Sequence, residues 1–146
     1  MIREPVTTCT LRRVDHVPDD VTAAIEQEPI DGTQVYLDTA WYALDFLFTI
    51  DADAYALLGF LSEPERAISA DDVEAIDEEL GFITEDQLRA RWNPARLREA
   101  NIPPPIWDRP PAEDDALGWV LGYFAQLQAL VHEAAKERQA LLVWFV

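Results

Sequence analysis

The spacing of apolar residues along this chain of 146 residues predicts a mostly helical protein. Capping residues and an apolar period of about 3.6 residues mark where the helices begin and which face they bury. The longest helix carries Gly118 and Gly122, which we expect to let another element approach closely. The expected helices cover residues 18–27, 38–48, 51–61, 69–81, 84–92 and 112–138, with a short turn or helix over 95–100.

Two segments near the ends of the chain have strand patterns instead. Residues 7–14, TTCTLRRV, are rich in β-branched side chains and partly alternate between apolar and polar. Residues 140–146, ALLVWFV, form a continuous apolar run that is typical of a strand buried on both faces. We therefore expect an α+β fold, a mostly helical single domain over residues 1–146 packed on a small sheet that includes the N- and C-terminal strands.

One carboxylate, Asp45, interrupts the apolar run AWYALDFLF at residues 40–48. With successive residues placed about 100° apart, Asp45 leaves the apolar stripe and joins Tyr42 and Asp38, the expected helix cap, on a polar strip. This strip is either a solvated helix edge or the lining of a cleft that binds or hydrolyses a small molecule. The candidate ligand-binding residues are Asp38, Trp41, Tyr42 and Asp45.

The chain has a net charge of −17, and its acids are concentrated in one region. Residues 17–86 hold nineteen acids against one base, Arg66, for a net charge of −18. Such a field repels DNA and RNA, whose binding needs clustered Lys and Arg. It can attract a basic protein partner and speed its approach, or it can serve only to keep the protein in solution.

Two stretches after the acidic region are distinctive, one basic and one rich in proline. The basic stretch is expected to pair with acids of the same chain, with a phosphate or acidic-ligand site as the alternative. Its residues are Arg89, Arg91, Arg96 and Arg98. The second stretch, IPPPIWDRPP at 102–111, cannot lie inside a helix or a central strand. We expect a rigid surface crossing packed on the domain, with binding to a partner in a polyproline II conformation as the alternative.

Cys9 is the only cysteine, which excludes an intrachain disulfide and suits a reducing cytoplasm. We expect this thiol to be packed in the core rather than paired with a histidine for catalysis. The N-terminal residues lack the apolar segment of a signal peptide, and no apolar run approaches the roughly 20 residues that span a bilayer. We therefore expect a cytoplasmic protein that does not bind membranes.

Sequence motifs for metals, nucleotides and nucleophilic catalysis are absent. His16 and His132 each lack a second ligand at metal-binding spacing. The DAD at 51–53 suggests calcium, but the other ligand positions of an EF-hand loop do not match. No P-loop, GxGxxG, GxSxG or CxxC motif occurs. We expect no metal and no cofactor, and these absences favour a protein without enzymatic activity.

Four stretches from residue 36 onward occur in a distinctive order: YLDTAWYALDFLF, SADDVEAIDEEL, TEDQLRARWNPARLREANIPPPIWD and LGYFAQLQALVHEAAKERQALLVWFV. Together they resemble the YfbM-like family, a bacterial group of small proteins of unknown function. The opening TTCTLRRVDHVPDDV is similar to the first strand and following helix of that family. The resemblance covers most of the chain and implies a single YfbM-like domain over residues 1–146.

Two departures from the family pattern bear on function. The family usually has Trp-His-Gly-Leu-His where this chain has WYALD, so Tyr42 and Asp45 replace both histidines. It also tends to carry a glycine-rich insertion where this chain has the short GFLSEPERAIS. Both departures weaken an enzymatic interpretation. Together with the charge, they favour an immunity-like or regulatory protein that binds a basic partner. The alternative is a small-molecule-binding or hydrolytic protein with its site at Asp38, Trp41, Tyr42 and Asp45.

Overall fold

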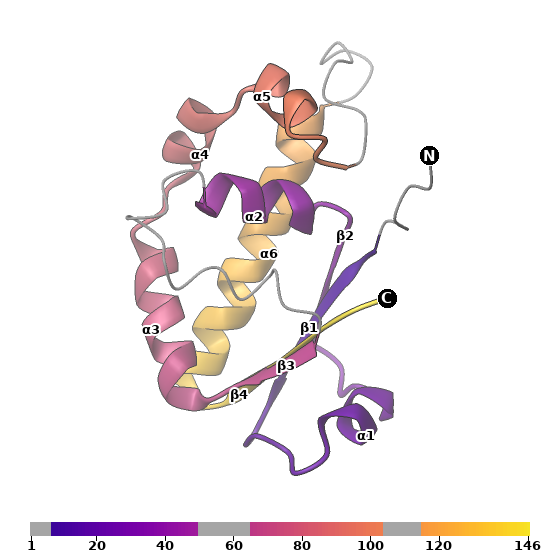
Figure 1. The fold of residues 1–146 in the computed structure, drawn as a ribbon. Helices are drawn as coiled ribbons and strands as arrows, with labels where there is room; N and C mark the ends of the chain where they lie inside the picture. Colours follow the sequence, from indigo (N-terminus) through magenta and orange to yellow (C-terminus); the bar gives the residue numbers. More distant parts are fainter. Residues whose placement is uncertain (1–6, 50–64, 104–114) are drawn as a thin grey trace.

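The structure is a computed structural model, and it describes residues 7–49, 65–103 and 115–146 (Figure 1). The helix expected over 51–61 and most of the proline-rich stretch 102–111 lie outside the described residues. In chain order the described elements are β1 (Cys9–Val14), α1 (Val21–Glu26), β2 (Gln34–Asp38), α2 (Trp41–Thr49), β3 (Glu65–Ile68), α3 (Ala70–Gly81), α4 (Glu85–Arg91), α5 (Pro94–Glu99), α6 (Ala116–Lys136) and β4 (Ala140–Phe145).

The first and last strands are the two central strands of one antiparallel sheet, whose order is β2-β1-β4-β3. Leu11 of β1 lies opposite both Val143 of β4 and Val35 of β2, and Ile68 of β3 lies opposite Leu141 of β4. Successive side chains of a strand point to opposite faces, so these five residues share one face, which we call the inner face. The expected α+β fold, with a small sheet that includes both terminal strands, is confirmed.

Helix α6 runs along the inner face, and α2 and α3 pack beside it (Figure 1). Phe124 of α6 and Phe48 of α2 are buried, and their ring centroids lie 6.0 Å apart in an edge-on arrangement. From α3, Val73, Ile76 and Leu80 are buried at the predicted helical spacing. The apolar face predicted for α6 forms the centre of the core. Its buried residues are Val120, Leu121, Phe124, Leu127, Leu130, Val131 and Ala134.

Helix α1 lies on the other side of the sheet, which we call the outer face (Figure 1). Arg12 of β1 and Trp144 of β4 point to this face and are only 7% and 8% exposed. The Arg12 guanidinium lies over the Trp144 ring, 5.0 Å from its centroid. Strand β4 is therefore buried on both faces, as its continuous apolar sequence predicts, because helices cover one face and α1 with Arg12 covers the other.

Side-chain caps begin three of the helices, two of them at the predicted starts, residues 69 and 84, while α5 begins one residue before the expected 95. Ser69 caps α3, and Thr84 and Gln87 form a reciprocal capping box on α4. Asn93 caps α5, whose first residue is Pro94. These side chains accept hydrogen bonds from backbone N–H groups that have no partner inside the helix, and proline at the first helical position needs none.

The helix expected over residues 38–48 begins later than predicted. Leu37 and Asp38 end strand β2, and α2 begins at Trp41. Asp38 is not a helix cap, because its φ of 53° places it in the left-handed region and its Oδ1 accepts a hydrogen bond from the adjacent Thr39 N at 2.8 Å. The apolar residues on both sides of Asp38 fit the spacing of a single helix. For this reason the sequence did not reveal strand β2.

Two further expectations need correction. The sequence did not predict β3, whose four residues ERAI are too few to show a strand period. The close approach expected at the glycines of α6 does not occur among the described residues. A side chain at Gly118 would collide with Asp115, the cap of the same helix, and no described atom of another element lies within 4 Å of a Cβ placed at Gly122.

Candidate functional site

The four candidate residues proposed from the sequence lie at the junction of β2 and α2, and each is half-buried. Two of them hold the segment before β1. Trp41 Nε1 donates to the carbonyl oxygen of Thr7 at 2.9 Å, and Thr7 N donates to Tyr42 Oη at 3.0 Å. The Trp41 and Tyr42 rings stack with centroids 3.9 Å apart, and Trp41 also contacts Phe145. These contacts give both aromatic residues a structural role at the start of β1.

Asp45 follows the buried Ala43 and Leu44, and its own side chain is half-buried at the edge of the core. Loss of water around it raises the pKa of Asp45 to about 6, from an ordinary value of 3.8. A carboxyl group with that pKa can exchange a proton near neutral pH, as general acid–base chemistry requires. Neither pocket described below is lined by any of the four candidate residues. A ligand site on this face stays a prediction.

Replacing Asp45 with asparagine is expected to stabilise the protein above pH 6. The folded chain keeps the Asp45 proton up to about pH 6, whereas an unfolded chain releases it near 3.8. Because the folded state binds more protons in this window, stability falls as the pH rises through it, and the neutral amide removes that loss. We expect Asp45→Asn to gain roughly 1–2 kcal/mol at pH 8, less than the full shift because the group is partly exposed, and about half as much at pH 5. Urea unfolding at pH 8 and at pH 5 measures the two gains in stability. Equal gains at the two pH values would contradict the burial argument.

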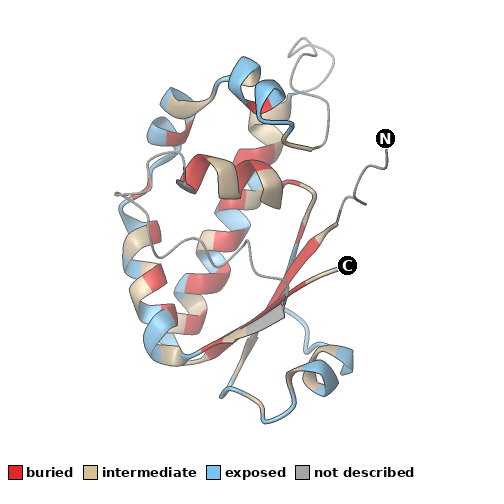
Figure 2. Cartoon of the chain, viewed as in Figure 1, coloured by how far each residue is buried: buried red, intermediate tan, exposed pale blue. Residues whose placement is uncertain are grey.

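The connection between β1 and β2, residues 15–33, is acidic throughout, and we call it the acidic connection. It contains no Lys or Arg. Two of its apolar side chains are exposed, Val17 by 44% and Ile30 by 77%. Figure 2 shows that α1, which lies within it, has exposed and intermediate residues and none that are buried. All six of its acidic residues are exposed: Asp15, Asp19, Asp20, Glu26, Glu28 and Asp31.

Arg12 holds the acidic connection against the outer face of the sheet. Its Nη1 donates to the carbonyl oxygen of Ala24 at 2.8 Å, and its Nη2 donates to that of Ile25 at 3.4 Å. These carbonyls belong to the last turn of α1, where Ala24 O also accepts a hydrogen bond from the backbone N of Gln27 at 3.3 Å. Arg12 Nε donates to Gln34 Oε1 at 3.0 Å, and Trp144 lies beneath the guanidinium. One buried side chain thus links α1, β1, β2 and β4.

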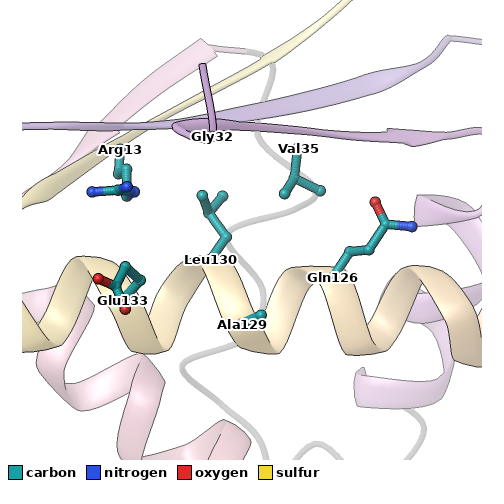
Figure 3. A pocket seen from close by; sticks show the side chains of 7 residues that line it. All are labelled: Arg13, Gly32, Val35, Gln126, Ala129, Leu130 and Glu133. Carbon is teal, nitrogen blue, oxygen red and sulfur yellow. The ribbon is translucent and has the colours of Figure 1, made fainter. Parts of the chain in front are cut away.

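A pocket of about 240 Å³ lies between the inner face of the sheet and α6 (Figure 3). Arg13 and Glu133 face one another at one end of it, and Gln126 lies at the other end. Apolar side chains lie between these polar ends. The sheet side contributes Arg13, Gly32 and Val35, and α6 contributes Gln126, Leu130 and Glu133.

A second hollow, of about 360 Å³, lies between α3 and α6. Ala129 of α6 lines both this hollow and the first pocket. His132 Nδ1 lies 3.2 Å from Asp77 Oδ1 at this hollow, and the His132 side chain is 72% exposed. Gln128 donates to the carbonyl oxygen of Leu80 at 2.8 Å and joins the two helices. The carboxylate therefore orients an imidazole that solvent can reach.

Other candidate groups have structural surroundings. Cys9 is completely buried in the core, as predicted, and burial raises the pKa of its thiol to about 12. From the basic stretch, Arg91 donates to the carbonyl oxygen of Leu47 at 3.2 Å, while pairing with acids stays a prediction. Within the described ranges, no three His, Cys, Asp or Glu side chains gather closely enough to hold a metal ion. No helix in those ranges is long and apolar enough to cross a membrane.

The sequence analysis did not single out Arg12 and Arg13, which occupy opposite faces of the sheet. Adjacent residues of a strand point in opposite directions, so Arg12 meets α1 and Arg13 meets α6. The available signal was a pair of arginines in a strand expected to pair with a fully apolar one. A guanidinium that is buried there needs acceptors nearby, because desolvating an unpaired charge is unfavourable.

The fold places the chain among small α+β proteins in which helices pack on a four-stranded antiparallel sheet. A family model described as Domain of unknown function (DUF1877) matches residues 7–144, and the chain belongs to this family. Its structure is similar to the crystal structure of YfbM from Escherichia coli, described as a protein of unknown function. The TM-score is 0.70 and the identity 16%, over 95% of this chain and 99% of that one. The YfbM-like resemblance is confirmed, and at this identity the likeness shows the fold alone. No curated protein matches the chain.

Proposed function

We propose that this protein is an interaction module that binds a basic protein partner through the acidic connection. The observation that supports it is the exposure of six carboxylates, together with Val17 and Ile30, in a segment without a base. Negative charge steers a basic surface toward such a segment, and exposed apolar side chains offer contacts that bury surface on binding. An immunity-like or regulatory role in the cytoplasm is part of this proposal.

Two of the six acids make hydrogen bonds that support the fold. The other four can therefore be changed to test binding without disturbing those bonds. Asp20 Oδ1 accepts a hydrogen bond from Ala23 N at 3.1 Å and caps α1. Asp15 Oδ1 accepts a hydrogen bond from Gln139 Nε2 at 3.0 Å. The other four acids are Asp19, Glu26, Glu28 and Asp31.

The test uses two variants with the same net charge. The connection variant combines Asp19→Asn, Glu26→Gln, Glu28→Gln and Asp31→Asn. The control variant neutralises four acids that are exposed on other elements, and it combines Glu74→Gln, Glu78→Gln, Glu99→Gln and Glu137→Gln. Each variant loses four negative charges, so its net charge rises from −17 to −13. Any difference between them reports the place of the charge rather than its amount.

Tagged wild type and both variants are used to capture proteins from the host lysate, at low and at high salt, with identification by mass spectrometry. We expect wild type and the control variant to retain one basic protein at low salt, and the connection variant to lose it. Salt above about 0.15 M should release this protein, because the interaction between exposed charges is then screened. Equal retention by both variants would place binding outside the acidic connection. The absence of any specific protein with wild type would overturn the proposal.

A second candidate function, the binding or hydrolysis of a small molecule at Asp38, Trp41, Tyr42 and Asp45, is favoured by the raised pKa of the half-buried Asp45. Screening small ligands by thermal shift against wild type and Asp45→Asn tests it. We expect a ligand of this face to raise the melting temperature of wild type only. If every ligand that stabilises wild type stabilises the variant equally, Asp45 is not part of a site.

A further inference from the structure

We propose that the pocket between the sheet and α6 binds a free α-amino acid, with Arg13 holding its carboxylate and Glu133 its ammonium group. This site lies on the inner side of the sheet, and it does not depend on the proposed protein partner. Three features of the pocket support the assignment: a guanidinium that the protein holds in place, an opposing carboxylate, and an apolar middle.

The Arg13 side chain is held in place from one side. Its Nη1 donates to Gln139 Oε1 at 2.9 Å, and the amide of Gln139 in turn donates to Asp15 Oδ1 at 3.0 Å. Its Nε is shielded from solvent and has no hydrogen-bond partner among the described residues. A ligand cannot reach this shielded Nε, so it would meet the outer nitrogens of the Arg13 guanidinium, which lines the pocket. A carboxylate is the partner that a guanidinium binds best.

Glu133 determines what else that partner must carry. It extends from α6 toward Arg13 at the same end of the pocket (Figure 3). An α-amino acid bears its carboxylate and its ammonium group on one carbon atom, so both groups reach one end of a pocket together. A simple anion would be repelled by Glu133 and by the net charge of −17 on the chain. A simple cation would be repelled by Arg13. A zwitterion satisfies both side chains.

The rest of the pocket defines the side chain of the ligand. Val35 and Leu130 form an apolar middle, and the Gln126 amide lies beyond them (Figure 3). The volume of about 240 Å³ is smaller than the roughly 300–1,000 Å³ of pockets for drug-sized ligands. A short aliphatic side chain fits this middle, and a terminal amide can reach Gln126.

The experiment is a titration of the full chain followed by amide chemical shifts in NMR spectra. The probes are L-valine and L-glutamine, with isovalerate and isobutylamine as matched compounds that lack the ammonium group and the carboxylate, respectively. We expect the two amino acids to shift the amides of Gly32, Val35 and Leu130 in a saturable way at millimolar concentrations. The two matched compounds should bind at least about tenfold more weakly, since each loses one charge-assisted contact.

Three variants complete the test. Glu133→Gln should weaken binding of L-valine about tenfold while leaving isovalerate unaffected or tighter, and Arg13→Gln should weaken both. Glu137→Gln, one turn further along and outside the pocket lining, should bind as wild type does. The proposal is overturned if neither amino acid gives saturable shifts at the pocket, or if isovalerate binds wild type as well as L-valine does. It is also overturned if Glu133→Gln, whose side chain retains its size, binds L-valine unchanged.

Discussion

Replacing Phe124 with alanine is expected to lower the free energy of unfolding by about 3–5 kcal/mol. Phe124 is 1% exposed and lies at the centre of the core, where its ring meets the edge of Phe48 from α2. Truncation removes apolar surface from this contact and leaves a cavity between α6 and α2, which the close packing of neighbouring helices cannot fully fill. Urea unfolding at pH 7.5, monitored by tryptophan fluorescence, measures the loss.

The matched control is Phe82→Ala. Phe82 follows α3 and is 71% exposed, so its truncation should change the free energy of unfolding by less than about 0.5 kcal/mol. A similar loss for both variants would mean that α6 does not form the centre of the core as described.

Replacing Arg12 with alanine is expected to cost roughly 2–3 kcal/mol of stability and to loosen the acidic connection. The variant loses the hydrogen bonds to the carbonyl oxygens of Ala24 and Ile25, the bond to Gln34 and the contact with Trp144. Helix α1 has six residues and none that are buried, and the two hydrogen bonds from Arg12 hold its last turn on the sheet. Hydrogen exchange should therefore accelerate in the amides of α1 more than in those of α6.

Arg89→Ala is the control, because Arg89 is exposed on α4 and far from α1 in the sequence. It removes the same charge without changing the outer face. Unchanged hydrogen exchange in α1 of the Arg12→Ala variant would show that other contacts hold the acidic connection. The Arg12→Ala variant also tests whether partner binding needs an ordered acidic connection in addition to its negative charge. It retains all six acids but not their arrangement, so we expect it to bind the partner more weakly than wild type.

Local signals explain why most of the elements could be predicted. Ser69 and Thr84 each cap a helix through contacts within a few residues, and the residue pattern of both caps is visible in the sequence. The continuous apolar run ALLVWFV required a central strand, and β4 occupies that place. Strand β2 was not predicted, because its pairing with β1 depends on residues more than twenty positions away and its apolar residues merge with those of α2.

The candidate site could be predicted only in part, for a different reason. The sequence placed Asp45 at the edge of α2, and it is half-buried there, but sequence spacing could not show how much water it loses. Trp41 and Tyr42 form their hydrogen bonds with Thr7, which precedes β1 and lies more than thirty positions earlier in the chain. Arg13 and Glu133 lie 120 positions apart in the chain and face one another only because α6 packs along the inner face of the sheet. Such pairs follow from topology and not from a motif.

The most direct test of the proposed interaction is the affinity of the captured partner, purified, for wild type and for the two charge variants. Titrations at ionic strengths from about 0.05 to 0.5 M give the salt dependence of each complex. We predict that the connection variant binds at least about tenfold more weakly than the control variant at low salt, with a flatter salt dependence. If the two variants, with equal net charge, bind with equal affinity and equal salt dependence, the acidic connection is not the binding surface.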